Sequence, residues 1–412
     1  MAGGVVAVLA CAAADLALLA IRGPLGLLND FNIYWSAARV LAGGGNPYSW
    51  TAVSRAHSGA GLSGVMGAGY VYPPAFIEAF RPLGSLTPRA AAAAFIGLSL
   101  LALAAGVALL LGSMPRLSWP KALVLGALAG LFPPVVGALW VGQANLLLLP
   151  ALALAYRGVA PGLWLMVASA VKIYPGVGLV ALAGRRDRLR QVGQAAAAGV
   201  ALLVAPAIFG MGAGGFSREL GGNLTADAYP TNQSMTGFLT RMALSQGWPL
   251  RGIPEVYSDG VAVALLAVAA ACLLWARRFQ PWEGSLAVSL SVGVLLAPRN
   301  SLWNYAPLLL AFAFAVPRLK GRPWLSVALA GGYLLTALQP LVWSLTTEGG
   351  TVAVAEYSSS LVAWTSSLGL YGGLAISLVC ARLVNAERRP ADRVRAGLVG
   401  TGAPLRRRPT AP

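Results

Sequence analysis

The sequence predicts an all-α polytopic membrane protein with about twelve transmembrane helices, several of them short or broken. Of its 412 residues, 57% are hydrophobic and only 10% are charged, whereas a soluble domain carries about 25% charged residues. The apolar residues gather in blocks of roughly 18 or more, which is enough to cross a bilayer. Short basic runs lie between the blocks, as is typical of cytoplasmic loops.

The apolar blocks give the expected spans in chain order. We place them at residues 3–21, 88–112, 119–136, 144–157, 160–183, 191–210, 258–277, 283–298, 301–317, 323–345 and 359–382. The first block lacks the basic start of a secretory signal and leads into a polar segment, so we interpret it as a span. Several blocks are too short for a straight crossing and contain Gly or Pro, which predicts broken helices around a wet or protein-packed site.

The basic runs orient the chain. Runs at 185–190, 277–278 and 318–322 are expected in the cytoplasm. That orientation puts four segments outside: 22–87, a first outer loop with an interfacial helix; 211–257, a second large outer loop; Arg299; and 346–358. Residues 1–386 then form a single transmembrane domain. Residues 387–412 are rich in Arg and Pro and are expected to form a basic, disordered cytoplasmic tail that touches anionic lipid.

Two topologies of the middle of the chain remain open. In the first, 160–183 is a helical hairpin broken at Tyr174-Pro175, which puts Gln143, Asn145 and Lys172 toward the outer half. In the second, residues 73–86 form a full span and Gln143 moves to the cytoplasmic side. We favour the first because 73–86 contains Glu78 and Arg81 and has the character of an interfacial segment.

Several function classes fit the sequence poorly. The net charge of +17 does not indicate nucleic-acid binding, because the arginines lie in short runs between spans rather than on one face. His57 is the only histidine, which argues against a histidine-based zinc site or a Ser/His/Asp triad. Cys11, Cys272 and Cys380 lie inside apolar runs without metal-ligand spacing. The acids of the outer loops are scattered singly, so we predict no metal site.

The most informative polar segment, residues 29–48, directly follows the first span. Asp30 stands at the expected outer boundary of the membrane, where an acid is partly dehydrated yet reaches an aqueous acceptor. Tyr34 and Ala38 follow at helical spacing, so one face of an interfacial helix can lie on the membrane. The turn Asn46-Pro47-Tyr48 ends the segment. In the alternative interpretation Asp30 only caps this helix, a role that Asp fills well.

Five polar motifs follow at the ends of apolar blocks. They are Tyr70-Val71-Tyr72-Pro73-Pro74, Gly142-Gln143-Ala144-Asn145, Lys172-Ile173-Tyr174-Pro175, Asn232-Gln233-Ser234-Met235 and Ala297-Pro298-Arg299-Asn300-Ser301-Leu302-Trp303-Asn304-Tyr305. With the Asp30 segment, and in this order, they resemble glycosyltransferase family 87 of the GT-C superfamily over about residues 28–320. Members of that family include polyprenyl-phosphate-mannose mannosyltransferases and related arabinofuranosyltransferases of actinobacterial envelopes.

The resemblance implies a GT-C-type fold and an inverting transfer in which Asp30 is the general base that takes the proton of the acceptor hydroxyl. Negative charge then builds on the departing lipid phosphate, which fixed cations and hydrogen-bond donors should stabilise. The residues expected there are Lys172, Arg299, Arg39 and Asn304. Related members often carry a histidine in the segment that matches 301–305. This chain has none, and Asn304 can donate a hydrogen bond but supplies no charge.

Amide and aromatic side chains are the expected sugar and acceptor contacts. They are Tyr34, Asn46, Tyr48, Tyr72, Gln143, Asn145, Asn232, Gln233, Trp303 and Tyr305. Each has a structural alternative, because amides also join helices in membranes and aromatic residues mark interfaces. Lys172 can likewise be a lysine that extends to the interface, and Arg299 an ordinary loop arginine.

The resemblance also sets expectations about partners. The donor is a polyprenyl-phosphate sugar, mannose by family frequency or otherwise arabinofuranose, and the acceptor is a lipid or glycan. We expect a monomer in the plasma membrane with the active site on the extracytoplasmic face, acting without a metal or another cofactor. A lipid flippase or secondary transporter is the alternative of another class, since broken helices and intramembrane lysines also mark transport sites. A non-catalytic envelope scaffold is the third.

Overall fold

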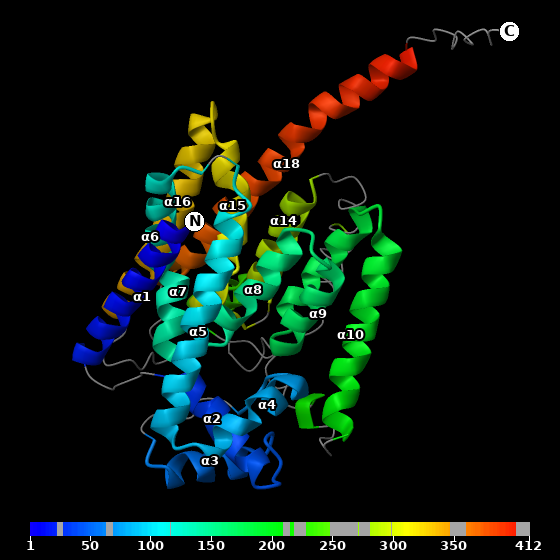
Figure 1. The fold of residues 1–412 in the computed structure, drawn as a ribbon. Coiled ribbons are helices and arrows are strands. Elements are labelled where there is room, and N and C mark those ends of the chain that lie inside the picture. The colour runs from blue at the N-terminus through cyan, green and yellow to red at the C-terminus, as the bar shows by residue number, and fades with distance from the viewer. Residues whose placement is uncertain are drawn as a thin grey trace, which may run out of the picture.

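The computed structural model describes residues 1–22, 28–62, 69–115, 117–208, 215–217, 228–247, 271, 281–297, 299–346 and 360–400. In this part of the chain the regular elements are helices, with one isolated antiparallel bridge between Asn232 and Ser301. Figure 1 shows a helical bundle with a smaller layer at one end, formed by α2 (Asn29–Ala42), α3 (Trp50–Gly59) and α4 (Pro74–Phe80). The end of α18 (Leu368–Gly400) extends beyond the opposite end of the bundle. The all-α prediction is confirmed for these residues.

Three helices have the length and composition to cross a membrane. They are α5 (Pro88–Leu111), residues 323–342 of α16 (Pro323–Thr346) and residues 368–387 of α18 (Leu368–Gly400). A fourth crossing is possible through α6 (Trp119–Gly130) and α7 (Pro133–Val141), which meet at an angle of 49° just before Pro133-Pro134. The other apolar helices are shorter. The chain is therefore a multi-pass membrane protein, and the count of about twelve spans stays a prediction.

Small residues allow the N-terminal helix to pack closely. α1 (Ala2–Arg22) runs alongside α6, and a Cβ added at Gly126 would lie 2.1 Å from the carbonyl oxygen of Gly4. A Cβ at Gly130 would lie 2.7 Å from the Cβ of Cys11. Backbones approach this closely only where side chains are absent, a common arrangement between membrane helices.

The segment 160–184 is a hairpin of two short helices. α9 (Pro161–Val171) is followed by the 3₁₀ helix η2 (Tyr174–Gly184), and Pro175 interrupts the α-helical pattern between them because it lacks an N–H. The Gly162 N–H, at the start of α9, donates to Gln191 in α10 (Arg188–Ile208), which follows η2. The two ends of the hairpin are thus neighbours, as the first topology expects, and the side of the membrane on which Gln143 and Lys172 lie stays a prediction.

The layer of short helices is not a membrane span. The second topology expected a full span at residues 73–86. The structure has α4 and the 3₁₀ helix η1 (Arg81–Ser85) there, and both are too short to cross a bilayer. Aromatic side chains bind α2 to this layer and to α5: the Phe31 ring lies 6.2 Å from that of Phe80 and 5.3 Å from that of Phe95. This core fixes α2, the helix that carries Asp30, against the bundle.

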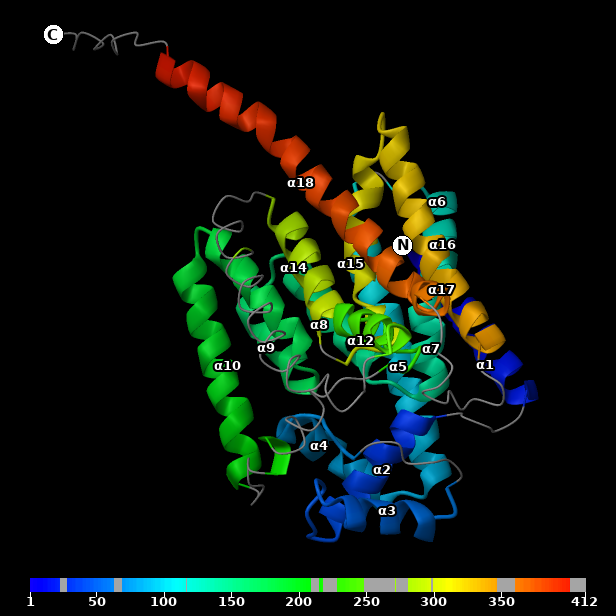
Figure 2. The same cartoon turned by 180° about the vertical axis from the view of Figure 1, so that it is seen from behind.

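The second half of the chain also uses short pieces. α8 (Asn145–Tyr156) and α14 (Trp282–Leu296) pass through the bundle, whereas the expected span 301–317 consists of η4 (Leu302–Tyr305), α15 (Leu308–Ala315) and η5 (Val316–Arg318). Figure 2 shows α12 (Met235–Ser245) beside α17 (Ser360–Thr365) on the other side of the bundle. The expected span 258–277 lies outside the described residues, except for residue 271.

The boundary of the C-terminal tail differs from the prediction. We expected disorder from residue 387, but α18 continues to Gly400, and residues 401–412 lie outside the described part. Glu387 accepts a hydrogen bond from Arg318 at 2.8 Å, which fixes the helix at the point where disorder was expected. Residues 388–400 include four arginines and two alanines, which are strong helix formers.

The close packing of α1 on α6 predicts a stability difference between two glycine variants. Gly126→Ala should lower the melting temperature of the detergent-purified protein, because the new methyl group would overlap the Gly4 backbone. Gly97→Ala in α5 should keep or raise it, because no atom lies within 4 Å of that Cβ position and alanine favours helix by about 1 kcal/mol. Equal melting temperatures for the two variants would contradict this packing.

Candidate active site

Asp30 lies in the first turn of α2, at the junction between the short-helix layer and the bundle. Leu28, just before α2, has a left-handed conformation (φ 61°), and its N–H donates to the carbonyl oxygen of Trp140 at 2.8 Å. Gly142 has φ +67°, and a Cβ there would lie 2.5 Å from the Cβ of Phe31. Because only glycine tolerates both conditions, Gly142 allows the turn between α7 and α8 to pack against the start of α2.

Gln143, the next residue in that turn, contacts Asp30 directly. Its Nε2 donates a short hydrogen bond to Asp30 Oδ2. Its Oε1 accepts the Ala144 N–H at 3.0 Å and lies 2.5 Å and 2.6 Å from the hydroxyl oxygens of Tyr34 and Tyr72. These two hydroxyl oxygens are 2.5 Å apart. Asp30, Gln143 and the two tyrosines, from three separate parts of the sequence, therefore form one hydrogen-bonded group.

Lys172 lies at the break of the α9–η2 hairpin, with extended backbone (φ −142°, ψ 141°). Its ammonium group donates to Asn304 Oδ1 at 2.6 Å and lies 5.3 Å from the centre of the Tyr72 ring. A cation at this distance from an aromatic face is stabilised by the ring quadrupole. These contacts with Asn304 and Tyr72 do not fit the alternative interpretation, in which Lys172 extends to the membrane interface.

Asn304 in η4 is held by two donors. Its Oδ1 accepts from Lys172 and also from the Asn145 Nδ2 at 2.6 Å. Asn145 Nδ2 additionally donates to the Trp303 carbonyl oxygen at 3.0 Å, and the Tyr174 hydroxyl lies 3.4 Å from Asn145 Oδ1. Because an ammonium group can only donate, the atom of Asn304 that faces it must be the oxygen. The Asn304 NH₂ group therefore points away from Lys172.

Asp30 and Lys172 influence each other without forming a salt bridge. Burial raises the pKa of Asp30 from 3.8 to about 6, and the positive charge of Lys172 opposes the rise. The carboxyl group is thus a base of moderate strength, not a permanently ionised surface acid. A carboxylate, an ammonium group and an amide NH₂ together suit a reaction in which a proton leaves one reactant and negative charge develops on another.

Comparison with known proteins identifies the family. The model of glycosyltransferase family 87 matches residues 70–298, more than half of the chain. The chain belongs to glycosyltransferase family 87. A search of curated proteins found no match. The matched region contains Tyr72, Gln143 and Lys172, whereas Asp30 and Asn304 lie outside it, so the place of these two residues in the site depends on their contacts in the structure.

Three of the residues expected to bind sugar form a second buried polar cluster in this glycosyltransferase. Gln233 donates to the carbonyl oxygens of Pro230 and Ser366, at 2.5 Å and 2.8 Å, and its Oε1 accepts the N–H of Leu370 at the start of α18. Tyr305 donates to the Gln233 carbonyl oxygen at 2.5 Å, and Asn232 Oδ1 accepts the Asn300 N–H at 3.0 Å. These contacts join separate segments of backbone, and sugar binding by these residues stays a prediction.

Sequence reasoning missed Arg241, which supports that cluster. Arg241 in α12 is completely buried and donates to the carbonyl oxygens of Tyr229 at 3.2 Å and Asn232 at 2.8 Å, and to Ser367 Oγ at 2.7 Å. A single charged residue inside an otherwise uncharged helix was the available signal. Tyr174, which lies beside Asn145, was quoted in a motif but not assigned to the site.

Several predicted residues lie away from the Asp30 group. Arg39 follows Asp30 by nine residues, about two and a half helical turns, so it lies on the opposite side of α2, where it is exposed and donates to the Gly84 carbonyl oxygen at 3.2 Å. Arg299 is exposed between α14 and η4. Asn46 is exposed and accepts the Tyr48 N–H at 2.9 Å. The Tyr48 hydroxyl donates to the Tyr72 carbonyl oxygen at 2.8 Å, which supports the site indirectly.

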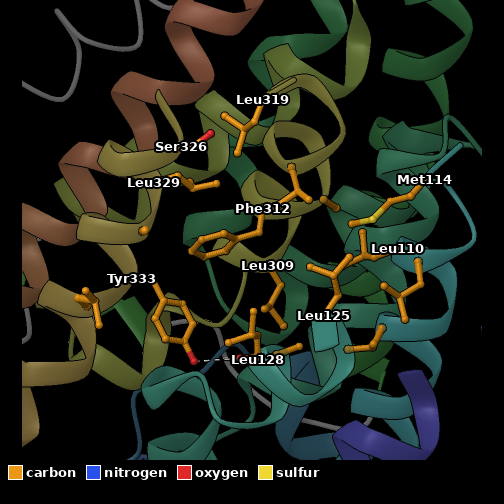
Figure 3. A pocket seen from close by; sticks show the side chains of 17 residues that line it. Leu110, Met114, Leu125, Leu128, Leu309, Phe312, Leu319, Ser326, Leu329 and Tyr333 are labelled. Atoms are coloured by element: carbon orange, nitrogen blue, oxygen red, sulfur yellow. Dashed lines mark hydrogen bonds between the residues drawn. The ribbon is translucent and has the colours of Figure 1, made fainter. Parts of the chain in front are cut away.

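Two apolar cavities lie in the bundle. The first, of about 480 Å³, lies between α5, α6, α15 and α16, and Figure 3 shows side chains such as Phe312, Leu309 and Tyr333 around it. None of the predicted site residues lines it. The second, of about 250 Å³, is lined by Trp140 and Trp303 together with residues of α7 and α16. This second cavity therefore adjoins the η4 turn that carries Asn304.

Within the described residues, no three His, Cys, Asp or Glu side chains gather in a way that could hold a metal ion. The carboxylate of Asp30 has neutral amide and hydroxyl neighbours and one lysine, a set of partners that favours hydrogen bonding rather than metal ligation. Transfer without a metal stays a prediction.

Proposed function

We propose that this glycosyltransferase moves a sugar from a polyprenyl-phosphate donor to a lipid or glycan acceptor at the extracytoplasmic face of the plasma membrane, with inversion at the anomeric carbon. The observation that carries the proposal is that the Asp30 carboxylate lies near the Lys172 ammonium group, which in turn binds Asn304. This arrangement offers a base and an anion-binding pair in one place. Mannose is the proposed sugar and arabinofuranose the alternative. The transfer needs no metal, and the enzyme acts as a monomer.

In the proposed reaction the acceptor oxygen attacks the anomeric carbon as its proton passes to Asp30. A new carbon–oxygen bond forms, and the bond between the anomeric carbon and the phosphate oxygen breaks. The phosphate keeps the electron pair and gains a second negative charge. Gln143 holds one carboxylate oxygen of Asp30, which leaves the other oxygen for the proton.

Lys172 and Asn304 are the proposed phosphate contacts. Lys172 supplies positive charge, and its bond to Asn304 turns the Asn304 NH₂ group away and makes it a possible donor. This pair takes the place of the histidine found in related members, since Lys172 supplies the positive charge and the Asn304 amide supplies a directional hydrogen bond. The apolar cavity beside Trp303 suits the first part of a hydrocarbon chain attached to that phosphate.

The proposed orientation depends on charge. The runs at 185–190 and 318–322 belong to the end of the bundle opposite the short-helix layer. The positive-inside rule assigns such loops to the cytoplasm, so the short-helix layer and Asp30 face the other side. A transporter is the weaker candidate, because the polar groups gather at one end, whereas transport sites typically lie at the midplane between two repeats.

The first test is a transfer assay with purified protein, a panel of polyprenyl-phosphate sugars and a membrane lipid extract, with products identified by mass spectrometry. Asp30→Asn should lower the transfer rate by about 10²–10⁴-fold, because an amide cannot accept the proton. Asp187→Asn is the matched control: this acid pairs with Arg185 at the basic end and should keep the wild-type rate. Near-wild-type transfer by Asp30→Asn would show that Asp30 is not the base.

The raised pKa of Asp30 predicts the pH dependence of the wild-type enzyme. The base must be ionised, so turnover should be highest above a pH of about 6 and should fall tenfold per pH unit well below it. The measurement is the transfer rate at saturating donor across pH 4.5–8. A rate that stays constant down to pH 4.5 would show that the essential base is a group with an ordinary carboxyl pKa or none at all.

Lys172→Met should lower kcat/KM for the lipid donor by about 10²-fold, because the departing phosphate loses a charged donor. Lys172→Arg should restore part of the rate, since the guanidinium group restores the positive charge but differs in shape from the ammonium group. Lys121→Met, at an exposed position in α6, is the control and should be silent. The assignment fails if Lys172→Met and Lys121→Met give the same kinetics.

A further inference from the structure

Gln143 was expected among the sugar contacts, yet its polar atoms face protein. It is 4% exposed, and both ends of its amide are in use. Oε1 faces the backbone N–H of Ala144, which can only donate. Nε2 faces Asp30 Oδ2, which as a carboxylate only accepts. Turning the amide over would set N–H against N–H and carbonyl against carboxylate, so one orientation is fixed by both neighbours.

The tyrosine hydroxyls strengthen that orientation. Tyr34 lies one helical turn after Asp30 on the same face of α2, and Tyr72 lies just before α4, so they reach Gln143 Oε1 from different segments. Tyr72 is itself held by the Tyr48 hydroxyl, which donates to its carbonyl oxygen at 2.8 Å. A buried network whose members are all satisfied keeps its side chains in one arrangement.

We infer that Gln143 is a positioning residue that holds the Asp30 carboxylate through its amide N–H, and that the hydroxyls of Tyr34 and Tyr72 lock this amide in place. The inference deepens the proposed function, because it names what orients the base. It assigns no substrate contact to Gln143. A hydrogen bond donated to a carboxylate stabilises the ionised form, so the loss of this bond must make Asp30 easier to protonate.

Other groups around Asp30 must be kept constant in a test. The positive charge of Lys172 lowers the pKa of Asp30. The negative charge of Asp30 raises the pKa values of Tyr34 and Tyr72. The remaining titratable side chains on α2 and on the elements packed against it are Arg39, Arg55, His57, Glu78, Arg81 and Arg89. Glu78 and Arg81 face each other at 3.7 Å.

The experiment measures the protonation of Asp30 without substrate. A hydrophobic carbodiimide modifies protonated carboxyl groups, and mass spectrometry of the Asp30 peptide across pH gives a labelling midpoint. In Gln143→Leu the midpoint should rise by about one pH unit relative to wild type. The Tyr34→Phe, Tyr72→Phe double variant should shift it in the same direction by less, because the amide remains but is held less firmly.

Gln191 provides a matched control. It is 3% exposed, its Oε1 accepts the Gly162 N–H, and its Nε2 donates to Asp187 at 2.7 Å, so it makes the same kinds of bonds away from the site. Gln191→Leu should leave the Asp30 midpoint unchanged. An unchanged midpoint in Gln143→Leu, or an equal shift in both leucine variants, would overturn the inference.

Turnover then separates the two proposals. If Asp30 is the base, the acidic limb of the kcat profile of Gln143→Leu should move with the labelling midpoint, and the donor KM should change by less than about threefold. If the labelling midpoint of Asp30 shifts but the acidic limb of the kcat profile does not, Gln143 positions Asp30 as inferred, but Asp30 is not the catalytic base. A raised KM with neither shift would make Gln143 a sugar contact instead.

Discussion

The structure depends on how one carboxylate and one ammonium group are kept in a largely dehydrated place without neutralising each other. A direct ion pair would hold both charges in place and leave neither free to act on a reactant. Gln143 contacts Asp30, and Asn304 contacts Lys172, so each charge has a neutral amide partner. Burying charge without partners is costly, and these amides reduce that cost while the charges stay available.

Short and broken helices make this arrangement possible. The break after α9 exposes the backbone turn that carries Lys172, the turn between α7 and α8 presents Gln143, and η4 presents Asn304. A continuous helix would direct these side chains around its whole circumference. Helix ends that meet at one depth in the bundle bring the side chains together there. Irregular backbone at this depth is tolerated where protein surrounds it. The second polar cluster, centred on Gln233 and Arg241, supplies such surroundings for the η4 segment.

Much of the fold was predictable from apolar blocks and basic runs, because membrane helices follow from hydropathy. The hairpin at 160–184 was also predictable, since Tyr174-Pro175 interrupts an apolar block that is otherwise long enough for one span. Within the site, the pairing of Asp30 with Gln143, Lys172 and Tyr72 joins segments up to 142 residues apart, and no pattern in the sequence measures such distances. Arg39 lies on the side of α2 away from Asp30, which follows from the helical angle between the two residues and not from their charges. The helix beyond residue 387 was missed because composition was weighed without the contact between Glu387 and Arg318.

The most direct test of this account is a structure of the enzyme bound to a non-transferable polyprenyl-phosphate sugar in lipid nanodiscs. The account predicts phosphate density within hydrogen-bond distance of Lys172 Nζ and Asn304 Nδ2, the first isoprene units beside Trp303, and the anomeric carbon on the line between the phosphate and Asp30. Phosphate bound at Arg39, at Arg299 or on the basic end of the bundle, with Asp30 and Lys172 closed on each other, would contradict it.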